Sequence, residues 1–254
     1  MAAQQMDDSL PGRRPHQQVG SFADTDPADR QELLAALQEA YDTMSDTVEK
    51  KVELIEKTRA YDGFFKIDRY RLRHTTPDGT MGPEITRENF ERGNAAAILV
   101  YDKDRDAVLL VEEFRIGNYA AGMTGEDAWS LAPMAGMIEE GETGIDCVIR
   151  EAREEAGIVI DEADVLGPWR ALSSPGGTSE IVDVFVAFAP LDLDPSLMGN
   201  DEGEFTRPVT MPREAMLELI DTKPVPASLA MAGMRLQRLL DLDKVPAAAP
   251  QIEI

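Results

Sequence analysis

The stretch from Gly136 to Ile158, GMIEEGETGIDCVIREAREEAGI, constrains the chain more than any other part of it. From Gly144 to Ala156 it predicts an amphipathic helix, because apolar residues recur at helical spacing: Ile145, Val148, Ile149, Ala152 and Ala156. The residue that follows, Gly157, suits the left-handed conformation in which many helices end. The helix also carries acidic residues off the apolar stripe: Glu151, Glu154 and Glu155.

These acidic residues allow two interpretations. A solvated acidic helix face is common in an acidic chain. The alternative is a metal site, since Glu142 in the preceding glycine-flanked loop can converge with the acids of the helix. Hard divalent cations such as Mg²⁺ bind oxygen ligands in such clusters, often with a phosphate completing the shell. Glu151 and Glu155 are one helical turn apart, and the repulsion between their charges destabilises the helix locally.

Composition narrows the classes of function. The 254 residues include 25 Lys and Arg against 48 Asp and Glu, a net charge of −23, so no basic nucleic-acid surface is expected. A phosphate substrate would meet a repulsive field, and bound cations with a few arginines must attract it. The two histidines argue against a zinc cluster, and the single cysteine, Cys147, excludes an intrachain disulfide and is expected to be unreactive. With no long apolar run and no signal-peptide core, we expect a cytoplasmic enzyme without a membrane partner.

The part of the chain before the acidic helix divides into five expected parts. Residues 1–25 read as a disordered tail, and 26–50 as a helix that starts at Asp26-Pro27. That helix either packs or contacts a dimer partner, or it links to another protein. Residues 52–93 read as a small β-rich unit, because FFKIDRYRLRH alternates and TPDGTMG is a turn signal. A hairpin follows, AAAILVYD and AVLLVEEFR around DKDRD, and then a loop, NYAAGMTGED.

Beyond the acidic helix the pattern changes to strands and then helices. Two strands are expected on either side of the loop SSPGGTSE, namely VLGPWRAL and EIVDVFVAFAPL. The acidic loop GNDEGEFTRP follows, and then two closing helices, REAMLELIDTK and SLAMAGMRLQRLL. Residues 94–244 therefore form the expected second domain, and 245–254 a loose tail.

The spacing within Gly136–Ile158 resembles the complete signature of the Nudix hydrolases, with no defined position departing from it. The matching positions are Gly136, Glu142, Arg150-Glu151-Ala152, Glu154-Glu155 and Gly157-Ile158. The resemblance implies cleavage of the diphosphate in nucleoside diphosphates linked to another group. It also implies Mg²⁺ or Mn²⁺ as cofactor, with two or three ions per site.

From about Val52 to Leu240 the chain is similar to the bacterial ADP-ribose pyrophosphatase branch of that family. The similarity rests on GFFKIDRYRLRH, ENFERG, VEEFRIGNY, AGMIEEGE, SPGGTSE and DEGEF. It departs at Pro175, which stands slightly further beyond the signature than is usual, and at Ala132, where a glutamate is usual. The implied fold is of the α/β (α+β) class: a Nudix α/β/α sandwich with a mixed sheet and a small N-terminal antiparallel β domain. In the branch that domain is exchanged between subunits of a homodimer, whose active site uses both chains.

The resemblance also implies roles in catalysis and metal binding. Glu151 and Glu155 would be metal ligands, with the carbonyl of Ala135 and with Glu204, while Glu154 would be a ligand or a neighbour of one. Glu142 and Arg150 would hold the loop against the helix. Glu202 matches the base that deprotonates the attacking water. The alternative for Glu202 and Glu204 is an ordinary solvated loop.

A second set of roles concerns the substrate. Arg115 and Arg87 match substrate contacts, and Arg92 is a weaker candidate; the alternative for each is a surface salt bridge of little worth. Phe64 matches a position near the adenine from the partner subunit, or is a core phenylalanine. The loop residues Gly176, Gly177, Thr178 and Glu180 are interpreted as a substrate-side loop, with a simple tight turn as the alternative.

Three functions compete at this point. The first is hydrolysis of ADP-ribose to AMP and ribose 5-phosphate. The second is a Nudix hydrolase acting on another substrate, such as GDP-mannose. The third is a Nudix-fold binding or regulatory protein without catalysis, and the retained acids of the signature argue against it.

Overall fold

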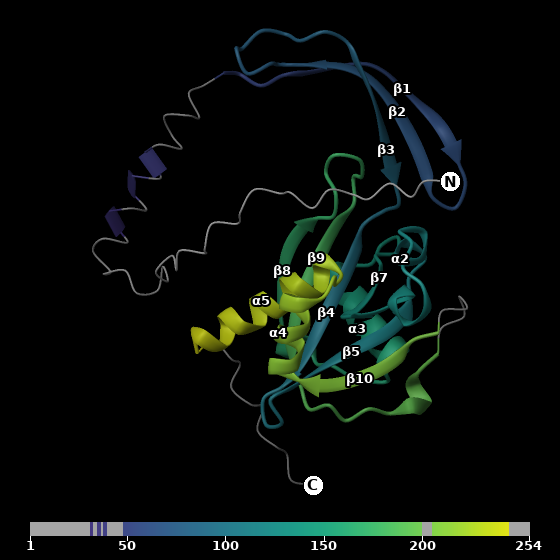
Figure 1. Ribbon diagram of the computed structural model, residues 1–254, viewed down its shortest axis with the longest axis vertical. Coiled ribbons are helices and arrows are strands. Elements are labelled where there is room, and N and C mark those ends of the chain that lie inside the picture. Colours follow the sequence, from purple (N-terminus) through teal and green to yellow (C-terminus); the bar gives the residue numbers. More distant parts are fainter. Residues whose placement is uncertain (1–30, 33–34, 37, 40–47, 200–204, 244–254) are drawn as a thin grey trace, which may run out of the picture. The chain divides into compact units, whose positions relative to one another are not determined.

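The computed structural model describes residues 31–32, 35–36, 38–39, 48–199 and 205–243 (Figure 1). The expected tails, 1–25 and 245–254, lie outside these ranges, and so does most of the helix expected over 26–50; the described residues within 31–39 are helical. The chain divides into two compact units, Met1–Glu53 with Arg73–Pro83, and Leu54–Leu72 with Glu84–Ile254. In the smaller unit, the predicted turn is present: Gly79 has a φ of +85°, and Asp78 accepts a hydrogen bond from the Thr80 N–H at 3.1 Å.

A three-stranded antiparallel sheet is formed within residues 52–91, in the order β1-β2-β3. Its strands are β1 (Val52–Asp62), β2 (Lys66–His74) and β3 (Ile85–Glu91). Every residue of β1 is exposed, including the apolar Leu54 and Ile55. The buried carboxylate of this sheet is Asp68, which pairs with Lys57 at 2.9 Å and with Arg59, and these two cations hold its pKa below its ordinary value.

The larger sheet is mixed, as expected for the Nudix-like fold. Its order is β10-β5-β4-β9-β8, with β6 paired to β5 and β7 to β4; the β4–β9 pair is parallel and the other pairs are antiparallel. The strands are β4 (Ala95–Asp102), β5 (Ala107–Phe114), β6 (Trp129–Ala132), β7 (Met134–Met137), β8 (Val165–Leu172), β9 (Ile181–Phe188) and β10 (Arg207–Pro212). The predicted hairpin is therefore confirmed as β4 and β5.

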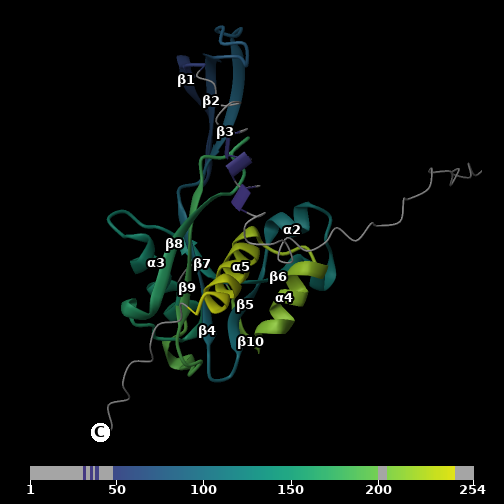
Figure 2. The same cartoon turned by 90° about the vertical axis from the view of Figure 1, so that its left-hand side faces the viewer.

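Helices cover both faces of this sheet (Figure 2). One face packs against α3 (Gly144–Ala156), and the other against α4 (Arg213–Thr222) and α5 (Ala227–Asp241). Alternation along β4 supplies both cores, because Ile98 points to the α3 side and Leu99 to the α5 side. The α/β/α sandwich is confirmed in this arrangement, and the two closing helices are those expected.

Two parts of the fold were not predicted. The strand β10 lies in a sequence with two prolines, Pro208 and Pro212, and pairs only with β5 at the sheet edge among the described strands, where proline is tolerated. The stretch interpreted as a loop after Phe114 contains the short helix α2 (Ile116–Ala120) and a 3₁₀ turn (Gly125–Ala128). In the described part of the chain the other 3₁₀ turns are Glu162–Asp164 and Pro195–Leu197.

Candidate active site

The helix α3 has the predicted bounds because both of its ends are capped. Thr143 and Asp146 form a capping box, in which Asp146 N–H donates to Thr143 Oγ1 at 3.3 Å and Thr143 N–H donates to Asp146 Oδ2 at 3.1 Å. At the other end Gly157 has a φ of +64°, and a Cβ there would lie 2.2 Å from the carbonyl oxygen of Asp194. Only glycine both adopts this positive φ readily and has no Cβ to clash with the Asp194 carbonyl, so Gly157 determines where α3 and its acidic residues end.

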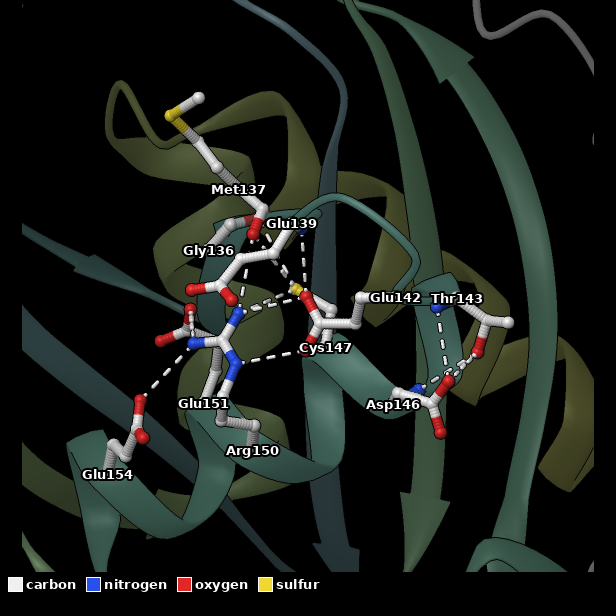
Figure 3. A network of polar contacts seen from close by, with 10 residues as sticks. All are labelled: Gly136, Met137, Glu139, Glu142, Thr143, Asp146, Cys147, Arg150, Glu151 and Glu154. Atoms are coloured by element: carbon white, nitrogen blue, oxygen red, sulfur yellow. Dashed lines mark hydrogen bonds and ion pairs between the residues drawn. The ribbon is translucent and has the colours of Figure 1, made fainter.

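Arg150 is the centre of the polar network on α3 (Figure 3). Its guanidinium binds the Glu142 carboxylate with two hydrogen bonds, from Nε to Oε1 at 2.9 Å and from Nη2 to Oε2 at 3.1 Å. The same group reaches Glu151 at 2.6 Å and Glu154 at 3.2 Å through Nη1, and the Met137 carbonyl oxygen at 3.3 Å. The pair expected between Glu142 and Arg150 is thus present, and it keeps the pKa of Glu142 below its ordinary value.

Glu155 differs from the other acids of the helix because it points into the interior. It is 1% exposed, and its Oε2 accepts a hydrogen bond from the Ala135 N–H at 3.1 Å. Burial raises the pKa of Glu155 to about 9, and the negative charge of Glu151 contributes. The three glutamates off the apolar stripe therefore differ in burial: Glu155 is buried where α3 packs against β7, whereas Glu151 and Glu154 are partly exposed.

Gly136 faces the Glu151 side chain. A Cβ built on Gly136 would lie 1.7 Å from Glu151 Oε1 and 2.3 Å from its Cδ, much closer than any real contact. The backbone of β7 and the carboxylate of α3 therefore approach each other only because position 136 has no side chain. This explains in physical terms why a glycine begins the stretch.

Sequence reasoning missed a buried carboxylate on the α3 side of the sheet, Glu113 at the end of β5. It is 7% exposed, and its Oε2 lies 2.6 Å from Nη2 of Arg115. Ala132, where the resemblance leads us to expect a glutamate, pairs with Val111 on the neighbouring strand, so Glu113 lies diagonally opposite it on the same face of the sheet. Strand alternation from Leu109 through Val111 could have placed Glu113 inward.

The loop from Ser173 to Glu180 is attached to the three-stranded sheet. Gly177 O accepts a hydrogen bond from the Phe90 N–H at 2.8 Å, and Thr178 Oγ1 donates to Phe90 O at 2.9 Å. Glu180 is buried and accepts a hydrogen bond from the hydroxyl of Ser173. Its Oε1 lies 3.1 Å from Nε of Arg92. The tight turn is present, since the Gly177 N–H bonds Ser174 O at 2.9 Å. Contact of this loop with a substrate stays a prediction.

Other predicted residues lie apart from the network of α3. Arg87 is exposed on β3 and donates to the carbonyl oxygen of Thr86 at 2.9 Å. Phe64 is 84% exposed, so the alternative of a core phenylalanine is wrong for the described chain. Among the described residues no ion pair joins Arg87 to the carboxylates of α3. Glu202 and Glu204 lie outside the described residues, and their roles stay predictions.

The sequence of this chain is similar to those of known proteins. A family model described as NUDIX domain matches residues 91–230. The chain belongs to the Nudix family. It is 40% identical over 171 residues to the ADP-ribose pyrophosphatase of Escherichia coli (strain K12), which covers 67% of this chain and 79% of that protein.

More distant similarities extend the comparison. The GDP-mannose pyrophosphatase of Yersinia enterocolitica is 34% identical over 137 residues, covering 54% of this chain and 69% of that protein. A crystal structure titled ADP compounds hydrolase aligns with a TM-score of 0.58 at 20% identity, covering 76% of this chain and 96% of that one, which supports the fold alone. The family's signature is therefore carried here on the loop and helix around Arg150.

The acidic residues of this Nudix signature suit a hard cation. Glu155 is a buried carboxylate without an ion pair to lysine or arginine anywhere in the described part of the chain, and Glu151 beside it adds negative charge. Within the described ranges, no three acidic, histidine or cysteine side chains converge in a metal-holding geometry. On α3, Glu151 and Glu154 are both ion-paired with the guanidinium of Arg150. Among the same residues no helix is long and apolar enough to cross a membrane.

Cys147 is the last residue of the signature region to be placed. It is fully buried in the core under α3, and burial raises the pKa of its thiol to about 12. The thiolate is therefore scarce at neutral pH, which supports the prediction that this cysteine is unreactive.

Proposed function

We propose that this chain hydrolyses ADP-ribose to AMP and ribose 5-phosphate with the help of a divalent cation. The observation that carries the proposal is Glu155, a carboxylate buried next to Glu151 and lacking a paired cation among the described residues. Such a group is costly to ionise unless a cation binds there. The similarity to ADP-ribose pyrophosphatases supports the choice of substrate.

The cation would be held by oxygen ligands only. We assign Glu151, Glu155 and the carbonyl of Ala135 to it, with Glu154 and Glu204 as further carboxylates, and Mg²⁺ or Mn²⁺ in two or three copies as the ions. Bound Mg²⁺ would neutralise the diphosphate and lower the pKa of a coordinated water. In this assignment the Ala135 N–H, which donates a hydrogen bond to Glu155, orients that carboxylate.

The remaining roles belong to residues around these carboxylates. Arg150 makes two hydrogen bonds to Glu142, so it can release Glu151 and Glu154 to a cation and still hold the loop. Arg115 and Arg87 are assigned to the substrate's phosphate oxygens, and Gly176, Gly177, Thr178 and Glu180 to its terminal ribose. Glu202 is assigned as the base that takes the proton of the attacking water.

A substrate panel tests the proposal. ADP-ribose, GDP-mannose, NADH, diadenosine polyphosphates and nucleoside triphosphates are incubated with the protein in Mg²⁺, and the products are identified. We expect the highest kcat/KM for ADP-ribose, with AMP and ribose 5-phosphate as products. A higher value for GDP-mannose would favour the second candidate, which the similarity to a GDP-mannose pyrophosphatase supports. Absence of any turnover would favour a binding or regulatory protein.

We further propose a homodimer in which the three-stranded sheet is shared between subunits. The support is the exposure of all of β1, including Leu54 and Ile55, and of Phe64 beyond its end, since exposed apolar residues in one strand mark an interaction surface. Light scattering is expected to give about twice the chain mass of 27.9 kDa. Leu54→Glu should shift the population to monomer, and Lys50→Glu, just before the strand, should not. A monomeric wild-type protein would contradict the proposal.

A further inference from the structure

Glu113 is a buried acidic residue that the proposed function leaves without a role. On β5 the side chains of Leu109 and Val111 enter the core under α3, whereas those of Val108 and Leu110 enter the core under α5. Glu113 continues the first series by strand alternation, so it lies at the end of β5 on the α3 side of the sheet. Its neighbour Glu112 lies on the opposite face.

The carboxylate of Glu113 is buried, and the side chain of its partner Arg115 is partly exposed. Glu113 is 7% exposed, while the side chain of Arg115 is 36% exposed; Oε2 and Nη2 are 2.6 Å apart. A desolvated carboxylate is stabilised mainly by the cation beside it, and separating the two groups costs free energy because a buried charge is left unpaired. Glu113 therefore restricts where the Arg115 guanidinium can lie.

The pair lies on the side of the sheet that packs against α3, because Val111 on the same face of β5 shares a core with Val148 of α3. The charge of Glu113 raises the pKa of Glu155 and the charge of Arg115 lowers it, so both groups are within electrostatic reach of Glu155. Arginine has five N–H donors in a planar fork, and the contact with Glu113 leaves donors for a second anion. A diphosphate held at Glu155 by a cation would find those donors in range.

We infer that Glu113 is a positioning residue, whose buried carboxylate holds the Arg115 guanidinium beside the carboxylates of α3 so that its remaining donors bind the substrate's diphosphate. This inference rests on the proposed function for the identity of the substrate. It does not depend on the base or the sugar, because the recognised group is the diphosphate.

A double-mutant cycle with Glu113→Gln and Arg115→Ala tests the inference in the full chain. Kinetic constants for ADP-ribose are measured in saturating Mg²⁺, and binding of inorganic pyrophosphate with Mg²⁺ is measured by calorimetry. We expect Glu113→Gln to raise KM and to weaken pyrophosphate binding roughly tenfold, since a charge-assisted contact is misplaced, with a much smaller change in kcat. In the Arg115→Ala background the same replacement should change neither quantity.

The matched control is Glu112→Gln on the same strand. Glu112 also pairs with an arginine, Arg207, at 2.8 Å, but on the opposite face, so its loss should leave KM and pyrophosphate binding unchanged. Glu113→Asp keeps the charge on a shorter side chain and should give an intermediate loss. If circular dichroism shows that the Glu113→Gln variant is unfolded, Glu113→Asp takes its place as the test variant.

Three results would overturn the inference. Glu113→Gln could bind pyrophosphate as tightly as the wild type, or it could lower kcat without changing KM. The third result is that Glu113→Gln changes KM and pyrophosphate binding equally in the wild-type and Arg115→Ala backgrounds. Failure of the proposed function has a different signature. The wild type would then not hydrolyse ADP-ribose, while the effect of Glu113 on pyrophosphate binding would persist and support the inference.

Discussion

Replacing Glu155 with glutamine is expected to lower kcat for ADP-ribose by about a hundredfold or more while the protein stays folded. Loss of a partner that only orients a metal ligand typically costs roughly 10- to 100-fold, and loss of a ligand should cost at least as much. Folding should survive because glutamine has the size of glutamate and can accept the same hydrogen bond from the Ala135 N–H. Steady-state kinetics in Mg²⁺, with circular dichroism for the fold, measure both effects.

The same replacement should change how stability depends on pH. The pKa of Glu155 is about 9 in the folded protein, against an ordinary value of 4.5, so the folded state binds one more proton between these values. In EDTA the contribution of Glu155 to the free energy of unfolding should therefore be fully present below pH 4.5 and be lost as the pH rises toward 9. Glu155→Gln should remove this slope, and Mg²⁺ should restore stability to the wild type at high pH by binding the ionised carboxylate.

Glu162→Gln is the control, because Glu162 is exposed in the 3₁₀ turn beyond α3 and should change neither kcat nor the slope. Glu151→Gln should resemble Glu155→Gln in activity. Near-normal turnover in both variants would contradict the assignment of Glu151 and Glu155 as metal ligands, whatever the pH dependence of stability.

The second large effect is expected from Gly136→Ala. The added methyl would lie 1.7 Å from Glu151 Oε1, so either the carboxylate or the backbone of β7 must move. Since the carboxylate is the far end of a flexible side chain, it should move first and leave its place beside Arg150. We expect a loss of roughly 10- to 100-fold in kcat/KM and a weaker response to Mg²⁺, with a small change in the melting temperature.

Gly117→Ala separates this effect from a general loss of glycine. A methyl on Gly117 meets no atom within 4 Å, so activity and Mg²⁺ dependence should stay close to those of the wild type. Titration of activity with Mg²⁺ for the three proteins is the measurement. Full activity of Gly136→Ala would mean that the position of Glu151 seen here is not needed for turnover.

Much of the site could be predicted because its information is local. The bounds of α3 follow from a capping box at Thr143 and a left-handed Gly157, and both are determined by neighbours a few residues away. The ion pair between Glu142 and Arg150 joins one loop to the helix that follows it, and the signature spacing already pointed to it. The hairpin of β4 and β5 is likewise a pairing of adjacent segments, with Asp102 opposite Ala107.

Elements with partners far along the chain were harder to predict. The strand β10 has a weak pattern with two prolines, and it forms because β5, about a hundred residues earlier, offers a sheet edge, with Glu112 opposite Arg207. The burial of Glu155 depends on β7 passing beside it, which no helical periodicity reveals.

The sequence by itself determined the family, the acidic helix and its caps, because these depend on residue spacing within one short stretch. The tertiary structure alone decided which acids are buried, since burial depends on strands and helices brought together from distant parts of the chain. Glu155 and Glu113 show this most clearly: each is an ordinary glutamate in the sequence, and each becomes a desolvated carboxylate only when α3 packs against the sheet.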